Sequence, residues 1–79
     1  MKITYIRKGL LDAYDKGLVD MERLKKDIYQ VEAADEDVTI KTEYGDVLVT
    51  KGNYVMTGHD GMQIGITQAD LEYQFDKKE

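Results

Sequence analysis

The fold is decided by VTIKTEYGDVLVTKGNYVMTGHDGMQIGI, residues 38–66, where apolar and polar side chains alternate. Val38 and Ile40 share one side of the first segment, and a period of two is typical of a strand with one buried face. The last of the intervening turns holds an Asp-Gly pair, which suits a tight β-hairpin. The pattern predicts turns at residues 44–46, 51–53 and 58–61. Strands are expected at 38–43, 47–50, 54–57 and 62–66.

A short helical turn is expected directly after the last of these strands. Thr67 and Asp70 have the spacing of a capping box, in which each end satisfies a free backbone N–H of the other. Ile66 and Leu71 occupy the positions of a hydrophobic staple across the same turn. We therefore predict a helical turn at 67–72. Residues 73–75 alternate again and predict a closing strand.

The segment that precedes the strands predicts the main helix. Asp20 is a suitable N-cap, because its carboxylate can accept the free N–H groups of the first turn. Met21, Leu24, Ile28 and Val31 then recur at spacings of three and four, which is the apolar stripe of a helix. We expect this helix at residues 20–32 and a first strand at 1–6. Residues 9–16 are left open between an extension of that strand and a first helical turn.

These elements predict an α+β fold. We expect one domain, residues 1–79, with a strand and helix in 1–34 and a β-meander in 35–76. An antiparallel sheet of four to five strands would carry the main helix on one face. The helical turn would precede the last strand. The expected core is Ile3, Leu24, Ile28, Val31, Val38, Ile40, Val47, Val49, Met56, Ile64, Leu71 and Phe75.

Charge is spread unevenly along the chain, whose formal net charge is −5. Residues 1–34 hold seven bases and six acids, a net charge of +1, whereas residues 35–79 hold four bases and ten acids, a net charge of −6. An acidic half repels phosphate backbones, so we expect no direct nucleic-acid partner. A basic protein surface is the partner that this charge suits. The alternative is that the acids serve solubility alone.

No residue pattern in the chain predicts catalysis. His59, the single histidine, sits in a turn beside Asp60 without a nucleophile to activate. The acidic run 35–37 lacks the spacing of a calcium-binding loop. Glu43 and Asp46 flank a turn, and the sequence nearby holds nothing that would raise the pKa of one carboxyl group above that of the other, as a pair of catalytic acids requires. We expect a protein that is not an enzyme, with no catalytic residue, no metal and no cofactor.

The expected setting is the cytoplasm. The chain has no cysteine, which fits a reducing compartment. Residues 1–8 lack the apolar run of a signal peptide, and no stretch is apolar over the ~20 residues that cross a bilayer. We therefore expect no membrane association. Self-association is left open.

The tips of the predicted hairpins are the candidate protein-binding site. A hairpin tip projects from a rigid sheet, so contacts there need little ordering on binding. Tyr44 is the tyrosine best placed for an exposed contact, because tyrosine combines a large rigid surface with a polar end. The candidate residues are Glu43, Tyr44, Asp46 and Asp60.

Residues 38–76 resemble a C-terminal module of small uncharacterised phage and prophage proteins. That module has a strand, a Gly-Asp turn, Pro-Gly-Asp-Tyr, a Thr-Gly step and a closing aromatic segment. The matching pieces here are residues 38–42, Gly45-Asp46, residues 51–54, Thr57-Gly58, residues 61–65 and residues 71–76. This chain departs from it at Lys51 and Asn53, where the module has Pro and Asp, and at Ile64-Gly65, where it has Tyr-Pro. The resemblance implies a phage-like origin and brings no active site.

Two roles follow from these expectations. The first is a non-enzymatic phage-type protein that binds a host protein, in counter-defence or host takeover, with inhibition of restriction or CRISPR systems as examples. The second is an accessory or structural subunit of a phage assembly that has no activity alone. In either role the partner is a host or phage protein.

Overall fold

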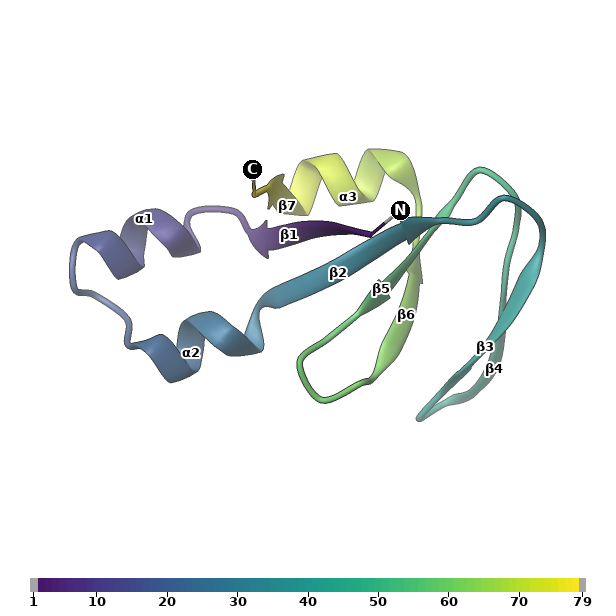
Figure 1. Cartoon of the computed structure of the whole chain (residues 1–79), viewed down its shortest axis with the longest axis horizontal. Helices are drawn as coiled ribbons and strands as arrows, with labels where there is room; N and C mark the ends of the chain where they lie inside the picture. The colour runs from purple at the N-terminus through teal and green to yellow at the C-terminus, as the bar shows by residue number, and fades with distance from the viewer. Residues whose placement is uncertain (1, 79) are drawn as a thin grey trace.

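The computed structural model describes residues 2–78. This part of the chain forms seven strands and three short helices (Figure 1). The strands are β1 (Ile3–Arg7), β2 (Ile28–Ala33), β3 (Val38–Thr42), β4 (Gly45–Val49), β5 (Tyr54–Thr57), β6 (Gln63–Ile66) and β7 (Phe75–Lys77). The helices are α1 (Leu10–Asp15), α2 (Met21–Lys26) and α3 (Gln68–Gln74).

Five strands form one antiparallel sheet in the order β6-β5-β2-β1-β7, and β3 and β4 form a separate two-stranded sheet. The mixed fold and the antiparallel sheet are thus as expected. The order differs from a meander over residues 35–76, because β5 pairs with β2 and not with β4. Ala34 N–H donates to Asn53 O at 2.9 Å and Gly52 N–H donates to Ala34 O at 3.1 Å. These two bonds hold the start of β5 beside the end of β2.

The expectation of one main helix at 20–32 is wrong. Helix α2 begins after its N-cap Asp20, whose carboxylate accepts from Arg23 N–H at 2.9 Å, and it ends at Lys26. Residues 28–33 form β2, the middle strand of the large sheet. The apolar spacing of Ile28 and Val31 fits a helix, but it also fits a strand whose two faces are both covered. Pairing with β1 and β5 selects the strand.

Two further helices, α1 and α3, lie near the start and the end of the chain. Residues 9–16, left open above, contain α1, which starts after Gly9 at φ 79°, a left-handed conformation that favours glycine. Helix α3 is capped as expected, with Thr67 Oγ1 accepting from Asp70 N–H at 3.2 Å. It runs through Gln74, so the closing strand starts at Phe75 instead of residue 73.

Each face of the large sheet has its own cover. Helix α3 packs on one face, where Val31, Met56, Leu71 and Phe75 form a buried cluster. Helices α1 and α2 cover one end of the opposite face around Ile6, Leu10 and Leu24. The β3–β4 hairpin covers the other end around Ala34, Ile40 and Val49. Helices α1 and α2 and the β3–β4 hairpin therefore stand at opposite ends of the molecule (Figure 1).

Most of the expected core is buried or half-buried. Two expected members are not: Val47 is 40% exposed and Ile64 is 45% exposed. Ile64 lies on the edge strand β6, and Val47 lies in the middle of β4, one of the two strands of the small sheet, so each lacks a paired strand on one side. The buried apolar residues that the expected core omitted are Ile6, Leu10 and Ala34.

Candidate functional site

The β3–β4 turn carries three of the four expected binding residues. Thr42 Oγ1 donates to Gly45 O at 2.8 Å and accepts from Tyr44 N–H at 3.2 Å, which fixes the turn from within. Gly45 adopts φ 111°, which a side chain would oppose. Glu43 is exposed, and Tyr44 is 91% exposed. The turn therefore presents an aromatic ring and a carboxylate to solvent on an ordered backbone.

Asp46 and Asp60 are placed differently from that pair. Asp46 lies on β4 opposite Lys41, so a cation on the neighbouring strand offsets part of its charge. Asp60 lies in the β5–β6 turn, where its Oδ1 accepts from Met62 N–H at 3.0 Å. That carboxylate therefore has a structural role in the turn.

The fold groups these residues on two separate hairpin tips. Glu43, Tyr44 and Asp46 belong to the β3–β4 tip and Asp60 to the β5–β6 tip. Both turns lie along the lower side of the molecule in the view of Figure 1. We call these four residues the hairpin-tip surface. Their role in binding stays a prediction.

A second feature, which sequence reasoning missed, is a row of polar side chains across the large sheet. Thr4, Gln30, Thr57 and Gln63 stand opposite one another on β1, β2, β5 and β6. Gln30 Nε2 donates to Thr4 Oγ1 at 3.1 Å, and Gln63 Nε2 donates to Thr57 Oγ1 at 3.5 Å. The row lies on the face of the large sheet opposite α3. Helices α1 and α2 cover one end of this face, and the β3–β4 hairpin covers the other end. We call the space above it the polar trough.

The sequence held one signal for this row. Residues 28–33 read Ile-Tyr-Gln-Val-Glu-Ala, in which Tyr29, Val31 and Ala33 alternate with polar Gln30 and Glu32. That alternation predicts a strand, and it conflicts with the helical stripe that ends at Val31. The cross-strand partners of Gln30 are distant in sequence, so no local pattern could have found the complete row.

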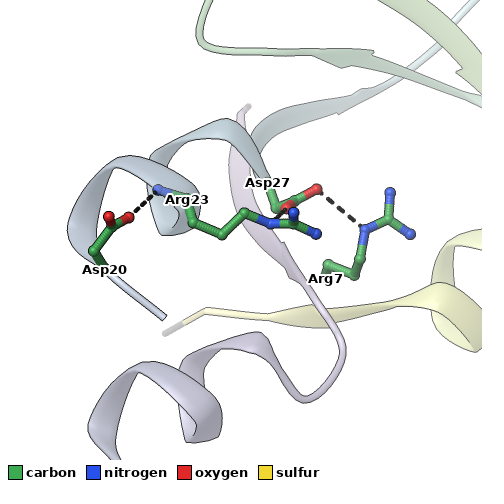
Figure 2. Close-up of polar contacts among 4 residues, drawn as sticks. All are labelled: Arg7, Asp20, Arg23 and Asp27. Carbon is green, nitrogen blue, oxygen red and sulfur yellow. Dashed lines mark hydrogen bonds and ion pairs between the residues drawn. The ribbon is translucent and has the colours of Figure 1, made fainter. Parts of the chain in front are cut away.

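A buried acid joins the helices to the sheet. The Asp27 side chain is 12% exposed, and its two oxygens contact Arg7 Nε at 3.1 Å and Arg23 Nε at 3.2 Å (Figure 2). Arg7 N–H also donates to Asp27 O at 3.2 Å, and its guanidinium lies 5.0 Å from the ring centre of Phe75. This arrangement neutralises the acid and fixes the junction of α2 and β2, so we assign it to stability.

The other sequence candidates are also used locally. Asp37 Oδ1 accepts from Lys51 N–H at 2.8 Å, which ties the acidic run 35–37 to the turn before β5. His59 is exposed in the β5–β6 turn. Within residues 2–78, no three His, Cys, Asp or Glu side chains gather closely enough to hold a metal ion. None of the helices in that range has the length and apolar character needed to cross a membrane.

Comparison with known proteins gives no relative. No protein-family model, no curated protein sequence and no solved structure matches this chain. The class of this chain is therefore given by its structure alone, as a mixed fold with a five-stranded antiparallel sheet.

Proposed function

We propose that this chain is a non-enzymatic phage-type protein that binds a basic surface on a host protein through its hairpin-tip surface. The observation that carries the proposal is the exposed Tyr44 beside Glu43, on a turn fixed by Thr42. The net charge of −6 in residues 35–79 supports a basic partner. Such binding blocks whatever the covered surface does, so inhibition is its simplest consequence.

The physical basis is the small ordering cost at a fixed turn. A flexible loop would lose conformational freedom on binding, whereas the backbone at residues 42–45 is already held by two internal hydrogen bonds. Tyr44 supplies contact area, and the carboxylates steer a basic partner toward it. The proposal needs no catalytic residue, cofactor, nucleic acid or membrane, and it places the protein in the host cytoplasm.

The test begins with affinity capture from host lysate to obtain a partner. Association rates are then measured from low to physiological salt for wild type and for Glu43→Lys with Asp46→Lys. We expect the rate to fall markedly with salt and with charge reversal, because steering acts mainly on association. Asp15→Lys with Glu22→Lys is the matched control, since it changes net charge equally on the exposed helices. Rates that stay within about twofold throughout would refute the proposal.

A second candidate role, a subunit that works only inside a phage assembly, is favoured by one observation. Leu18 is 74% exposed between α1 and α2, and Met21, the first residue of α2, is also exposed. Exposed apolar side chains that gather at one end of a small domain are typical of a docking surface. Co-purification of the chain with virion proteins, lost in Leu18→Glu, would support this role over the first.

A further inference from the structure

The β5–β6 turn holds the single aspartate–glycine pair of the chain, Asp60-Gly61. Both residues are exposed to solvent. In such a pair the backbone nitrogen of the glycine can attack the carboxyl carbon of the aspartate and close a five-membered ring. A side chain on the following residue hinders this attack, and every other aspartate of the chain is followed by a residue that carries one. Asp60 is therefore the aspartate best suited to this reaction.

The reaction rearranges the backbone and needs no reagent except water and protons. The Gly61 nitrogen bonds to Cγ of Asp60, and one carboxyl oxygen leaves as water with the amide proton and a proton taken from solvent. Water then opens the ring at one of its two carbonyl carbons. Opening at Cγ restores aspartate, whereas opening at the original backbone carbonyl gives isoaspartate. In isoaspartate the chain continues through Cγ, so the backbone is one methylene group longer.

Two hydrogen bonds restrain both reacting groups while the turn is closed. Gly61 N–H, which must lose its proton, donates to Gly58 O at 3.1 Å. The Asp60 carboxylate, which must lose an oxygen, accepts from Met62 N–H through Oδ1 at 3.0 Å. Attack therefore requires the turn to open. Exposed turns are among the segments of a folded protein that open at the lowest free-energy cost.

The product cannot rebuild the closed turn. Besides the two bonds above, Gly58 N–H donates to Met62 O at 2.9 Å, so all three bonds lie within residues 58–62. Isoaspartate adds a methylene group to the backbone inside this span, and the carbonyl that accepted from Met62 N–H becomes part of the chain. The turn joins β5 to β6, which is an edge strand of the large sheet. Strand β6 therefore loses support at its start.

We propose that Asp60-Gly61 is a site of spontaneous isomerisation to isoaspartate, gated by the opening of the β5–β6 turn. The closed turn slows the reaction in the folded protein, and the product loosens β6 from β5. The modified residue exposes a free α-carboxylate, which is the group that isoaspartyl methyltransferases methylate with S-adenosylmethionine. This chemistry is confined to one turn and holds whether or not the hairpin-tip surface binds a basic partner.

The test compares the folded chain with the same chain unfolded in guanidinium chloride, and the folded sample contains sodium chloride at equal ionic strength. After incubation at neutral pH and removal of the denaturant, isoaspartate is labelled with a methyltransferase and tritiated S-adenosylmethionine and located by peptide mass spectrometry. We expect label at residue 60 in both samples. It should accumulate roughly tenfold more slowly in the folded chain, because two hydrogen bonds must open first.

Asp60→Glu is the matched control, because it keeps the charge but would have to close a six-membered ring. It should remove the label. Asp60→Asn gives a second measurement, since it closes the same ring with loss of ammonia and each conversion to a carboxylate raises the intact mass. The folded variant should again react more slowly than the unfolded one. Equal rates in folded and unfolded chains would overturn the gating.

The remaining outcomes test the site and its consequence. Label at another aspartate, label that persists in Asp60→Glu, or a folded wild type without any label would overturn the assignment of the site. The isomerised protein, separated by chromatography, should exchange the amide hydrogens of residues 63–66 faster than the unmodified protein does. Unchanged exchange in those residues would overturn the proposed loosening of β6.

Discussion

Asp27 joins three segments of the chain at the residue scale. Its carboxylate pairs with Arg23 on its own helix and with Arg7 on β1, and Arg7 in turn lies over Phe75 of the α3-covered cluster. A carboxylate with so little exposure is costly unless both oxygens are satisfied. The two arginines supply those partners and thereby fix α2 against the sheet.

Asp27→Asn should lower the free energy of unfolding by about 1–3 kcal/mol. The amide keeps the volume of the acid but loses the charge that both arginines contact, and a hydrogen bond to a charged group contributes about that much. Urea unfolding followed by circular dichroism measures the change. Asp12→Asn, which breaks the exposed Asp12–Lys16 pair on α1, should cost less than about 0.5 kcal/mol. An equal decrease in the free energy of unfolding in the two variants would show that the buried Asp27 pairs stabilise the fold no more than an exposed pair does.

Gly65 is required by a close approach between the two sheets. A β-carbon built on Gly65 would lie 2.8 Å from Cγ2 of Val49, and the backbone φ there is not positive, so the obstacle is space alone. Gly65→Ala should therefore destabilise the protein by about 1–3 kcal/mol through overpacking. In the Val49→Ala background the same change should cost much less. A thermal-melt double-mutant cycle with no coupling energy would contradict this account.

At the scale of elements, the sequence indicated most strands and missed the one that organises the sheet. Local alternation and turn chemistry predicted strands at 38–43, 47–50, 54–57 and 62–66 and the cap at Thr67. These strands correspond to β3, β4, β5 and β6, except that β4 already begins at Gly45, inside the predicted turn, and ends at Val49. The prediction of a helix at 20–32 is wrong because Leu24 lies on α2 whereas Ile28 and Val31 lie on β2. Their helical spacing arises only because these two elements follow one another directly at Asp27. Strand β2 is selected by partners on β1 and β5, which local sequence does not contain.

One part of the candidate site could be predicted from the sequence and the other part could not. The exposure of Tyr44 could be predicted, because a residue before a Gly-Asp turn projects from a hairpin. The polar trough could not, because Gln30 was assigned to a helix and because its register with Thr4 and Thr57 depends on distant pairing.

The β3–β4 hairpin should be separable from the large sheet. Ile40 packs in a cluster with Ala34 and Val49, distinct from the cluster of Val31, Met56, Leu71 and Phe75. Ile40→Ala should cost about 2–4 kcal/mol and raise hydrogen exchange mainly in residues 38–49. Leu71→Ala should raise exchange across the whole sheet. A uniform rise in both variants would mean that the two sheets open as one cooperative unit.

At the scale of the whole molecule, the net charge and the secondary structure both differ between the two halves of the chain, because residues 1–34 carry +1 and residues 35–79 carry −6. Helices α1 and α2 stand at one end and the β3–β4 hairpin at the other (Figure 1).

This polarity predicts that DNA is not retained. The net charge of −5 repels the phosphates of a duplex. In a gel-shift assay at low salt, we expect no retarded band up to about 100 µM protein, the weak limit of ordinary non-specific binding. A band that appears below that concentration and fades with added salt would show that the trough, or another basic region, accepts phosphates.

The two hydrogen bonds between Ala34 and the turn at Gly52 and Asn53 have an evolutionary consequence. They bring the ends of the intervening segment together, so residues 35–51 form a closed excursion from a sheet whose register does not depend on them. The tip of this excursion can change in length or sequence without altering the pairing of the large sheet, whereas Ile40 and Val49, which pack against it, cannot. An engineer could therefore graft a different hairpin at the same two ends, with apolar side chains kept at the positions of Ile40 and Val49.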